Sequence, residues 1–142
     1  MKTEPQMLRD EDSGNKRVCI YLIAPDDAYE HHQEFVQKQV NVIQLINDTA
    51  GWQYEDMYMD RRGEQSAFNE MLEDCIQGKI DVIVTKSIWQ FAGSIRETLA
   101  TALMLLAHDP PVEIVFSDQA VFSSDRDKID PMLEKYGVVR TE

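Results

Sequence analysis

Charged side chains follow several of the apolar runs that we interpret as strands in this chain of 142 residues. Carboxylates near a lysine at the carboxyl edge of a sheet can hold Mg²⁺ and a phosphoryl group. The alternative is that these loops are polar only because water solvates them. A phosphoacceptor site of this kind needs a carboxylate after the third strand, where a lysine stands, so the sequence favours solvated loops. The residues in question are Asp26, Asp27, Asp60, Lys86 and Asp118.

The segment 78–99 is the stretch around which the rest of the chain is organised. Residues 81–85 form a short apolar run typical of a buried strand, and Lys86 and Ser87 follow it. Ser94 and Glu97 then stand three apart, the spacing of a capping box at the start of a helix. A polar loop between a strand and a capped helix is where open α/β sheets place ligands, so we expect the functional site there.

Histidines and cysteines are weaker candidates for chemistry. His31 and His32 are adjacent on a predicted helix, so their rings diverge by about 100° and solvated surface is the better interpretation than a metal site. Cys19 and Cys75 lie within apolar patterns, which favours buried thiols in a reducing compartment over a disulfide. We therefore expect neither a metal nor a cofactor.

Strand and helix patterns alternate along the chain. This order predicts a three-layer α/β domain with a mainly parallel four-stranded sheet and helices on both faces, although it does not reveal the strand order. Residues 1–15 are expected to be disordered, 16–122 to form the domain, and 123–142 to be a polar tail with a short helix at 131–136. The expected strands are 17–24, 52–60 (near an edge), 82–85 and 112–116; the helices are 29–50, closed by Gly51, 68–76, closed by Gly78, and one that starts at Ser94 and ends before Pro110.

The charge balance limits the classes of partner. The net charge is −12, which repels the phosphate backbone over most of the surface, so general nucleic-acid affinity is not implied. No secretory signal pattern and no apolar run near 18 residues is found, so we expect a cytoplasmic protein that does not enter a membrane.

Three stretches give the chain a resemblance to the catalytic domain of serine recombinases, the resolvase/invertase family. The opening strand 18–24 (VCIYLIA) resembles that family's first strand, and residues 60–81, with FNEML and GKID, resemble a D-x-G…RPxFxxML…GxID segment. Residues 84–94 (VTKSIWQFAGS) are similar to VxKxLSRFGRN, and Gln39 falls where the family has a glutamine. The resemblance spans about residues 17–122 and implies a resolvase-like fold and DNA recombination chemistry.

The catalytic positions of that family are the places where this chain departs from it. The family attacks DNA with a serine hydroxyl and surrounds the scissile phosphate with arginines. The position of the nucleophile is Pro25 here, and no arginine remains at the positions expected to carry one. These are Ile23, Gln65, Gln90 and Gly93. The resemblance therefore implies a pseudoenzyme.

Several hypotheses follow from this degenerate resemblance. The first is an accessory or protein-interaction module whose partner is another recombinase-family protein or a second copy, with weak or absent DNA binding. The second is a residual DNA-binding role through Arg61, Arg62 and Lys86, and the third is Mg²⁺-dependent or small-molecule binding at the sheet edge. Only about twenty mostly polar residues follow 122, too few and too acidic for the family's DNA-binding modules. Phe91 is expected to pack under its loop, whereas Trp89 either covers the pocket or is exposed. The pocket residues we expect to be retained are Gln39, Asp60, Lys86 and Ser87.

Overall fold

The computed structural model describes residues 15–89 and 91–140, and in it strands and helices alternate as predicted. The strands are β1 (Lys16–Ala24), β2 (Trp52–Arg61), β3 (Val82–Thr85), β4 (Glu113–Phe116) and β5 (Val121–Phe122). The helices are α2 (His32–Asp48), α3 (Ser66–Ile76), α4 (Ile95–Ala107) and α5 (Arg126–Tyr136).

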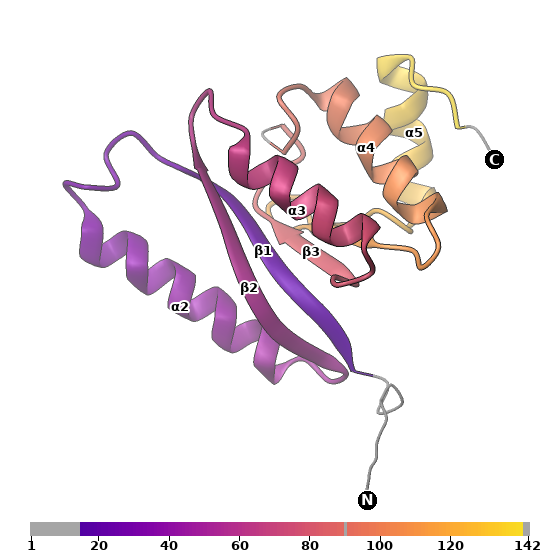
Figure 1. Ribbon diagram of the computed structural model, residues 1–142. Coiled ribbons are helices and arrows are strands. Elements are labelled where there is room, and N and C mark those ends of the chain that lie inside the picture. Colours follow the sequence, from indigo (N-terminus) through magenta and orange to yellow (C-terminus); the bar gives the residue numbers. More distant parts are fainter. Residues whose placement is uncertain (1–14, 90, 141–142) are drawn as a thin grey trace, which may run out of the picture.

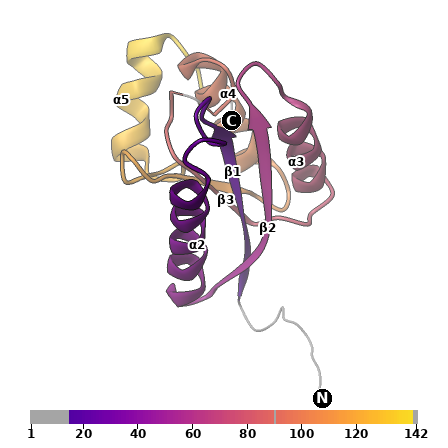
Figure 2. The same cartoon turned by 90° about the vertical axis from the view of Figure 1, so that its left-hand side faces the viewer.

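The strands form one twisted sheet in the order β2-β1-β3-β4-β5. The first four strands in this order are parallel to one another, and β5 runs antiparallel to β4. Helix α2 covers one face alone, while α3, α4 and α5 lie on the opposite face (Figure 1). Figure 2 shows α2 running alongside β1 and β2, with α3 on the far side of β2. The chain therefore has the three layers that the alternation predicted.

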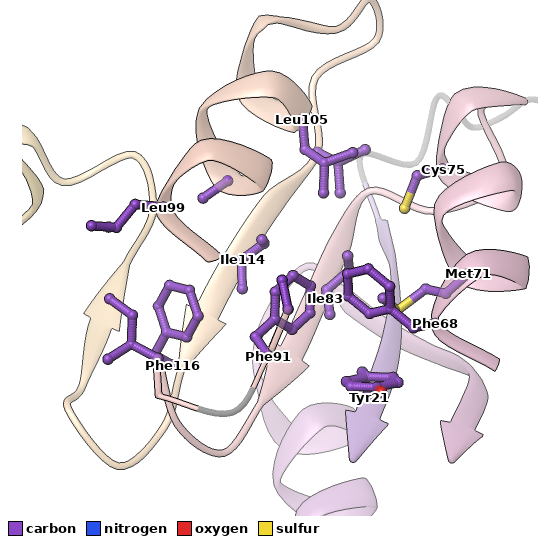
Figure 3. Packing of buried hydrophobic residues seen from close by; sticks show 14 of the residues in the cluster. Tyr21, Phe68, Met71, Cys75, Ile83, Phe91, Leu99, Leu105, Ile114 and Phe116 are labelled. Carbon is purple, nitrogen blue, oxygen red and sulfur yellow. The ribbon is translucent and has the colours of Figure 1, made fainter. Parts of the chain in front are cut away.

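Residues of β1 alternate between two cores, as a strand covered on both faces requires. Cys19 and Tyr21 pack with α3, α4 and α5, whereas Val18 and Ile20 pack against α2. Four aromatic rings form edge-to-face contacts in the larger core, with centroids between 5.1 and 6.3 Å apart (Figure 3). Such pairs contribute about 0.5–1.5 kcal/mol each beyond their burial, so they hold the loop after β3 in place. The rings are those of Tyr21, Phe68, Phe91 and Phe116.

The sheet has five strands, so the prediction of a four-stranded parallel sheet was incomplete. Strand β5 contains only two residues, Val121 and Phe122, and two residues are too few to show an alternating pattern in the sequence.

The segment after 123 also differs from the predicted polar tail with a helix at 131–136. Helix α5 begins at Arg126, and its Ile129 and Leu133 are buried in the larger core. One apolar pair at i, i+4 spacing among charged residues is enough to dock this helix.

The predicted start of α4 is confirmed. Ser94 is the N-cap residue of α4, and its hydroxyl accepts a hydrogen bond from the backbone N–H of Glu97 at 3.1 Å. Helix α2 is shorter than the predicted 29–50, because residues 26–31 form turns and Thr49 rather than Gly51 is its C-cap. Gly51 has a φ of +81° in the turn that leads into β2.

Both cysteines are buried and free, as predicted. Burial raises the pKa of Cys75 to about 12. Among the helices of the described residues, none has the length and apolar character needed to span a membrane.

An ion pair joins the start of β1 to the segment before β3. Arg17 donates to the Asp81 carboxylate from its backbone N–H at 2.8 Å, from Nε at 3.0 Å and from Nη2 at 3.2 Å. Partial burial alone would raise the pKa of Asp81, but the side-chain and backbone hydrogen bonds from Arg17 outweigh it and lower the pKa below its usual value. The folded state therefore favours the ionised carboxylate.

We expect Asp81→Asn to lower the free energy of unfolding by about 1 kcal/mol at neutral pH, since the pair is partly exposed. A lowered pKa stabilises the fold above the unfolded carboxyl pKa of about 3.9, and this stabilisation disappears as pH falls through the folded value. The difference in melting temperature between the wild type and the variant should therefore shrink below about pH 4. Thermal melts over a pH series measure it, with the exposed Glu30→Gln as control. A difference that stays constant into acid would contradict the assignment.

Candidate functional site

The strand order creates a crevice at the carboxyl ends of β1 and β3. These two strands are neighbours, yet β1 leads into α2 on one face and β3 leads towards α4 on the other (Figure 1). Open α/β sheets bind ligands where the connections diverge in this way. A cleft of about 1230 Å³ lies here, lined by residues from the carboxyl ends of β1, β3 and β4, from α2 and from the loop after β2.

The structure brings together the positions at which the resemblance places catalytic groups. Ile23 and Pro25, at the end of β1, line the cleft with Gln65 and Gly93, which precede α3 and α4. Gln90 lies outside the described residues. Side chains at these four positions supply neither a hydroxyl nor a positive charge. Four positions spread over 71 residues of sequence therefore share one cleft that lacks the family's catalytic groups.

Two of the four expected pocket residues, Gln39 and Lys86, also line the cleft, whereas Asp60 and Ser87 do not. Both of these are buried with their polar atoms engaged. The Ser87 hydroxyl accepts a hydrogen bond from the backbone N–H of Trp89 at 3.1 Å. The Asp60 carboxylate accepts hydrogen bonds from the start of α3 and from the Tyr21 hydroxyl. In this structure both residues support the walls of the cleft instead of facing a ligand.

Charges of both signs surround the cleft, so it does not concentrate positive charge. Arg62 forms an ion pair with Asp26, with 3.2 Å between Nη2 and Oδ2. The His31 ring lies 3.9 Å from the Asp27 carboxylate and 3.6 Å from that of Glu34. The lining residues with formal charge are the acids Asp27, Glu34, Glu64 and Asp118 and the cations Lys38, Arg62 and Lys86.

Hydroxyl groups in the lining are poorly placed to act as nucleophiles. The Tyr21 hydroxyl donates to Asp60 at 2.9 Å, and burial together with this hydrogen bond raises the pKa of Tyr21. Thr85 is buried at the end of β3, and Ser117 is an exposed residue after β4. Activation of a hydroxyl needs an adjacent base that lowers its pKa or takes its proton. The contact between Tyr21 and Asp60 accompanies a raised pKa, and across the described residues the hydroxyls of Thr85 and Ser117 form no hydrogen bond with a base.

The backbone at Gly93 is specific to glycine. Its φ is +93°, a conformation that other residues rarely adopt. A Cβ atom at this position would lie 3.0 Å from Oε1 of Glu97 and 3.8 Å from Nε2 of Gln65. The loop conformation therefore disfavours an arginine, the residue that the family resemblance leads one to expect at this position.

The two aromatic residues of the loop after β3 have different environments. Phe91 is buried beneath the loop, as predicted, whereas Trp89 keeps 55% of its surface exposed. The Trp89 ring also contacts Tyr136 at the end of α5, edge to face, with centroids 6.2 Å apart. Trp89 therefore lines the cleft without closing it.

The suggested metal or phosphoryl cluster is only partly assembled. Asp27, Lys86 and Asp118 line the cleft, but Asp26 and Asp60 do not. Across residues 15–89 and 91–140, no three His, Cys, Asp or Glu side chains gather in a way that could hold a metal ion.

Lys38 is one of several lining residues that the sequence analysis did not single out. It lies on α2 three residues after Phe35 and four before Val42, both of which also line the cleft. This i, i+3, i+7 spacing places Lys38 on the helix face directed at the sheet, a signal that the sequence already contained.

Solved structures share this fold. A crystal structure of a resolvase family site-specific recombinase from Streptococcus pneumoniae is similar with a TM-score of 0.65 and 19% sequence identity, over 87% of this chain and 86% of that chain. The N-terminal catalytic domain of TP901-1 integrase is similar with a TM-score of 0.57 and 15% identity, over 86% of this chain and 97% of that one. No family model and no curated protein matches the chain. At these identities the likeness is one of fold, and it confirms the fold that the resemblance implied.

Proposed function

We propose that this chain, which has the fold of recombinase catalytic domains, is a catalytically inactive relative of the serine recombinases that acts as an accessory or protein-interaction module. The observation that carries the proposal is the composition of the cleft. Ile23, Pro25, Gln65 and Gly93 meet there, and none of them offers a nucleophile or a cation. These four positions therefore supply no group that could attack a phosphodiester and none of the cations that the family uses to stabilise the transition state.

Exposed aromatic residues beside the cleft support a role in protein contacts. Tyr29 is 92% exposed in the turn after β1, and Trp89 is 55% exposed in the loop after β3. Large aromatic side chains are enriched among the residues that dominate binding energy at protein interfaces. The partner we propose is a second copy of the chain or another recombinase-family protein.

Residual DNA contact is the second candidate function, and it has less support. Arg61, Arg62 and Lys86 are exposed near the cleft, but Arg62 is already paired with Asp26. Four carboxylates also line the same cleft, and the whole chain carries a net charge of −12. Phosphate contacts supply most non-specific DNA affinity, so this distribution of charge disfavours duplex binding.

Binding to a fluorescently labelled DNA duplex at low salt distinguishes the two candidates. We expect the fluorescence anisotropy to stay flat up to the highest protein concentration, because no surplus of cations faces the duplex. Saturable binding that weakens with added salt would instead support the DNA-binding role.

Sedimentation velocity of the chain alone, and of the chain mixed with a resolvase-family recombinase, measures partner contact. Trp89→Ala and Tyr29→Ala should weaken any complex, and a monomer in both samples would contradict the interaction module.

A further inference from the structure

Two lysines that line the cleft have no side-chain partner among the described residues. Lys38 lies on α2 and Lys86 follows β3, and both side chains are exposed. Neither side chain has an ion pair or hydrogen bond with any other residue that the structure describes, whereas Arg62 is held by Asp26. Ammonium groups that come to one cleft from two different elements can bind one anionic group together.

The lining of the cleft also includes apolar side chains. Residues of β1, α2 and β3 supply aliphatic and aromatic surface among the polar groups. Trp89 adds an indole ring at the rim, held on one side by Tyr136 and otherwise open. Such a surface favours a flat apolar group that can stack on the indole and lie against the aliphatic side chains. The apolar lining residues of these three elements include Ile20, Leu22, Phe35, Val42 and Val84.

Hydrogen-bond acceptors lie beside the same cleft. The carboxylate of Asp118 after β4 and the amide of Gln39 on α2 belong to its lining. A carboxylate repels a polyanion but accepts hydrogen bonds from hydroxyl or amino groups. The mixed charge therefore selects a ligand with one anionic group and several hydrogen-bond donors, and it selects against an extended phosphate backbone.

We propose that this cleft binds a mononucleotide, that is, a phosphorylated sugar carrying a planar base. The phosphate would lie between Lys38 and Lys86, the base would stack on Trp89, and the sugar hydroxyls or base amino group would donate to Asp118. The position supports this assignment, because the β1/β3 switch point is where sheets of this strand order place phosphorylated planar ligands. The volume of about 1230 Å³ exceeds what such a ligand requires. The proposal is independent of the protein-interaction role and would stand if that role failed.

Tryptophan fluorescence provides the first test. In a Trp52→Phe background Trp89 is the one tryptophan left in the chain, so it reports directly on the cleft. Titration with AMP, GMP, CMP and UMP should give saturable quenching for at least one of them. The matching nucleoside, which lacks the phosphate, should bind about tenfold or more weakly, because it loses the charge-assisted contacts to the lysines. Isothermal titration calorimetry with the same compounds detects binding that leaves the fluorescence unchanged.

Lysine variants locate the phosphate. Lys86→Gln and Lys38→Gln should each weaken mononucleotide binding about tenfold and leave nucleoside binding unchanged. Lys79→Gln is the matched control, because Lys79 lies outside the cleft and its ammonium group is 3.8 Å from Asp74. Thermal melts confirm that the variants fold. Equal binding by the wild type and both cleft variants would overturn the proposal.

A single-stranded oligonucleotide distinguishes free nucleotide from nucleotide within DNA. The mononucleotide should compete with it, and the oligonucleotide should bind no more tightly than the mononucleotide does. An oligonucleotide that binds tightly while no mononucleotide is detected by fluorescence or calorimetry would overturn the proposal in favour of single-stranded DNA. The absence of binding for all of these compounds would also overturn it, and the duplex-binding and sedimentation experiments would still test the proposed function separately.

Discussion

Pro25→Ser is expected to give neither strand cleavage nor a covalent protein–DNA adduct. A serine hydroxyl is a weak nucleophile unless a base or nearby positive charge activates it. The other described positions of the family's catalytic set, Ile23, Gln65 and Gly93, provide no charge. The loss of one preorganised donor typically lowers the rate by about 10²–10³. The loss of three donors around one phosphate lowers it further, although not by the product of the single effects. The restored hydroxyl would therefore face a phosphate without the arginines that stabilise the transition state in the family.

Denaturing gels of end-labelled duplex DNA measure this result, because a covalent adduct moves as a shifted band. The matched comparison restores all five positions together, with serine at Pro25 and arginine at Ile23, Gln65, Gln90 and Gly93. A covalent band from Pro25→Ser alone would refute the account given for the missing cations. Thermal melts of both variants exclude unfolding as the cause of inactivity.

The backbone conformation at Gly93 disfavours even the variant in which all five positions are restored. With φ at +93°, an arginine there is strained by about 1–3 kcal/mol, and its Cβ would lie 3.0 Å from the Glu97 carboxylate. The same carboxylate oxygen is 3.3 Å from the Ser94 hydroxyl that caps α4. The loop conformation and the helix cap thus depend on a residue without a side chain. We therefore expect the restored variant to be less stable than the wild type and to remain slower than an active recombinase.

The sequence was sufficient to predict most of the elements but not how they are assembled. Buried strands such as β1 and β3 are apolar on both faces, and α3 has a clear stripe from Phe68 to Cys75, so local pattern identifies them. Strand order depends on which face each helix covers, and periodicity does not contain that information. Strand β5 was missed because its two residues show no alternating pattern, and the first five residues of α5 were missed because the buried Ile129 lies among charged ones.

The candidate site was predicted in part because its positions follow the ends of strands. In a parallel sheet these ends meet at one edge, so Pro25 and Lys86 had to come close once β1 and β3 were neighbours. The direction in which each polar side chain points was harder to predict. Asp60 ends β2 like the others, yet its carboxylate points into the protein and not into the cleft.

Asp60→Ala is expected to lower the free energy of unfolding by about 3–5 kcal/mol, the largest stability effect predicted for this chain. The carboxylate accepts hydrogen bonds from the backbone N–H groups of Ala67 and Phe68, each at 2.9 Å, at the first turn of α3. It also accepts one from the Tyr21 hydroxyl at 2.9 Å. The N-cap residue of α3, Gln65, makes no side-chain capping bond, so Asp60 performs that role from β2. Alanine would leave these donors buried without an acceptor.

Urea unfolding, monitored by circular dichroism, measures the effect. Two further variants separate the contributions of the individual hydrogen bonds to it. Tyr21→Phe removes one hydroxyl and leaves the helix cap intact, so we expect a loss of about 1 kcal/mol. Asp60→Asn retains one oxygen acceptor but turns an amide group towards buried donors and removes the negative charge from the N-terminus of α3, so its effect should be intermediate. A loss below about 1 kcal/mol for Asp60→Ala would mean that water satisfies these donors. Asp60 would then be accessible from the cleft, and its interpretation as a pocket residue would regain support.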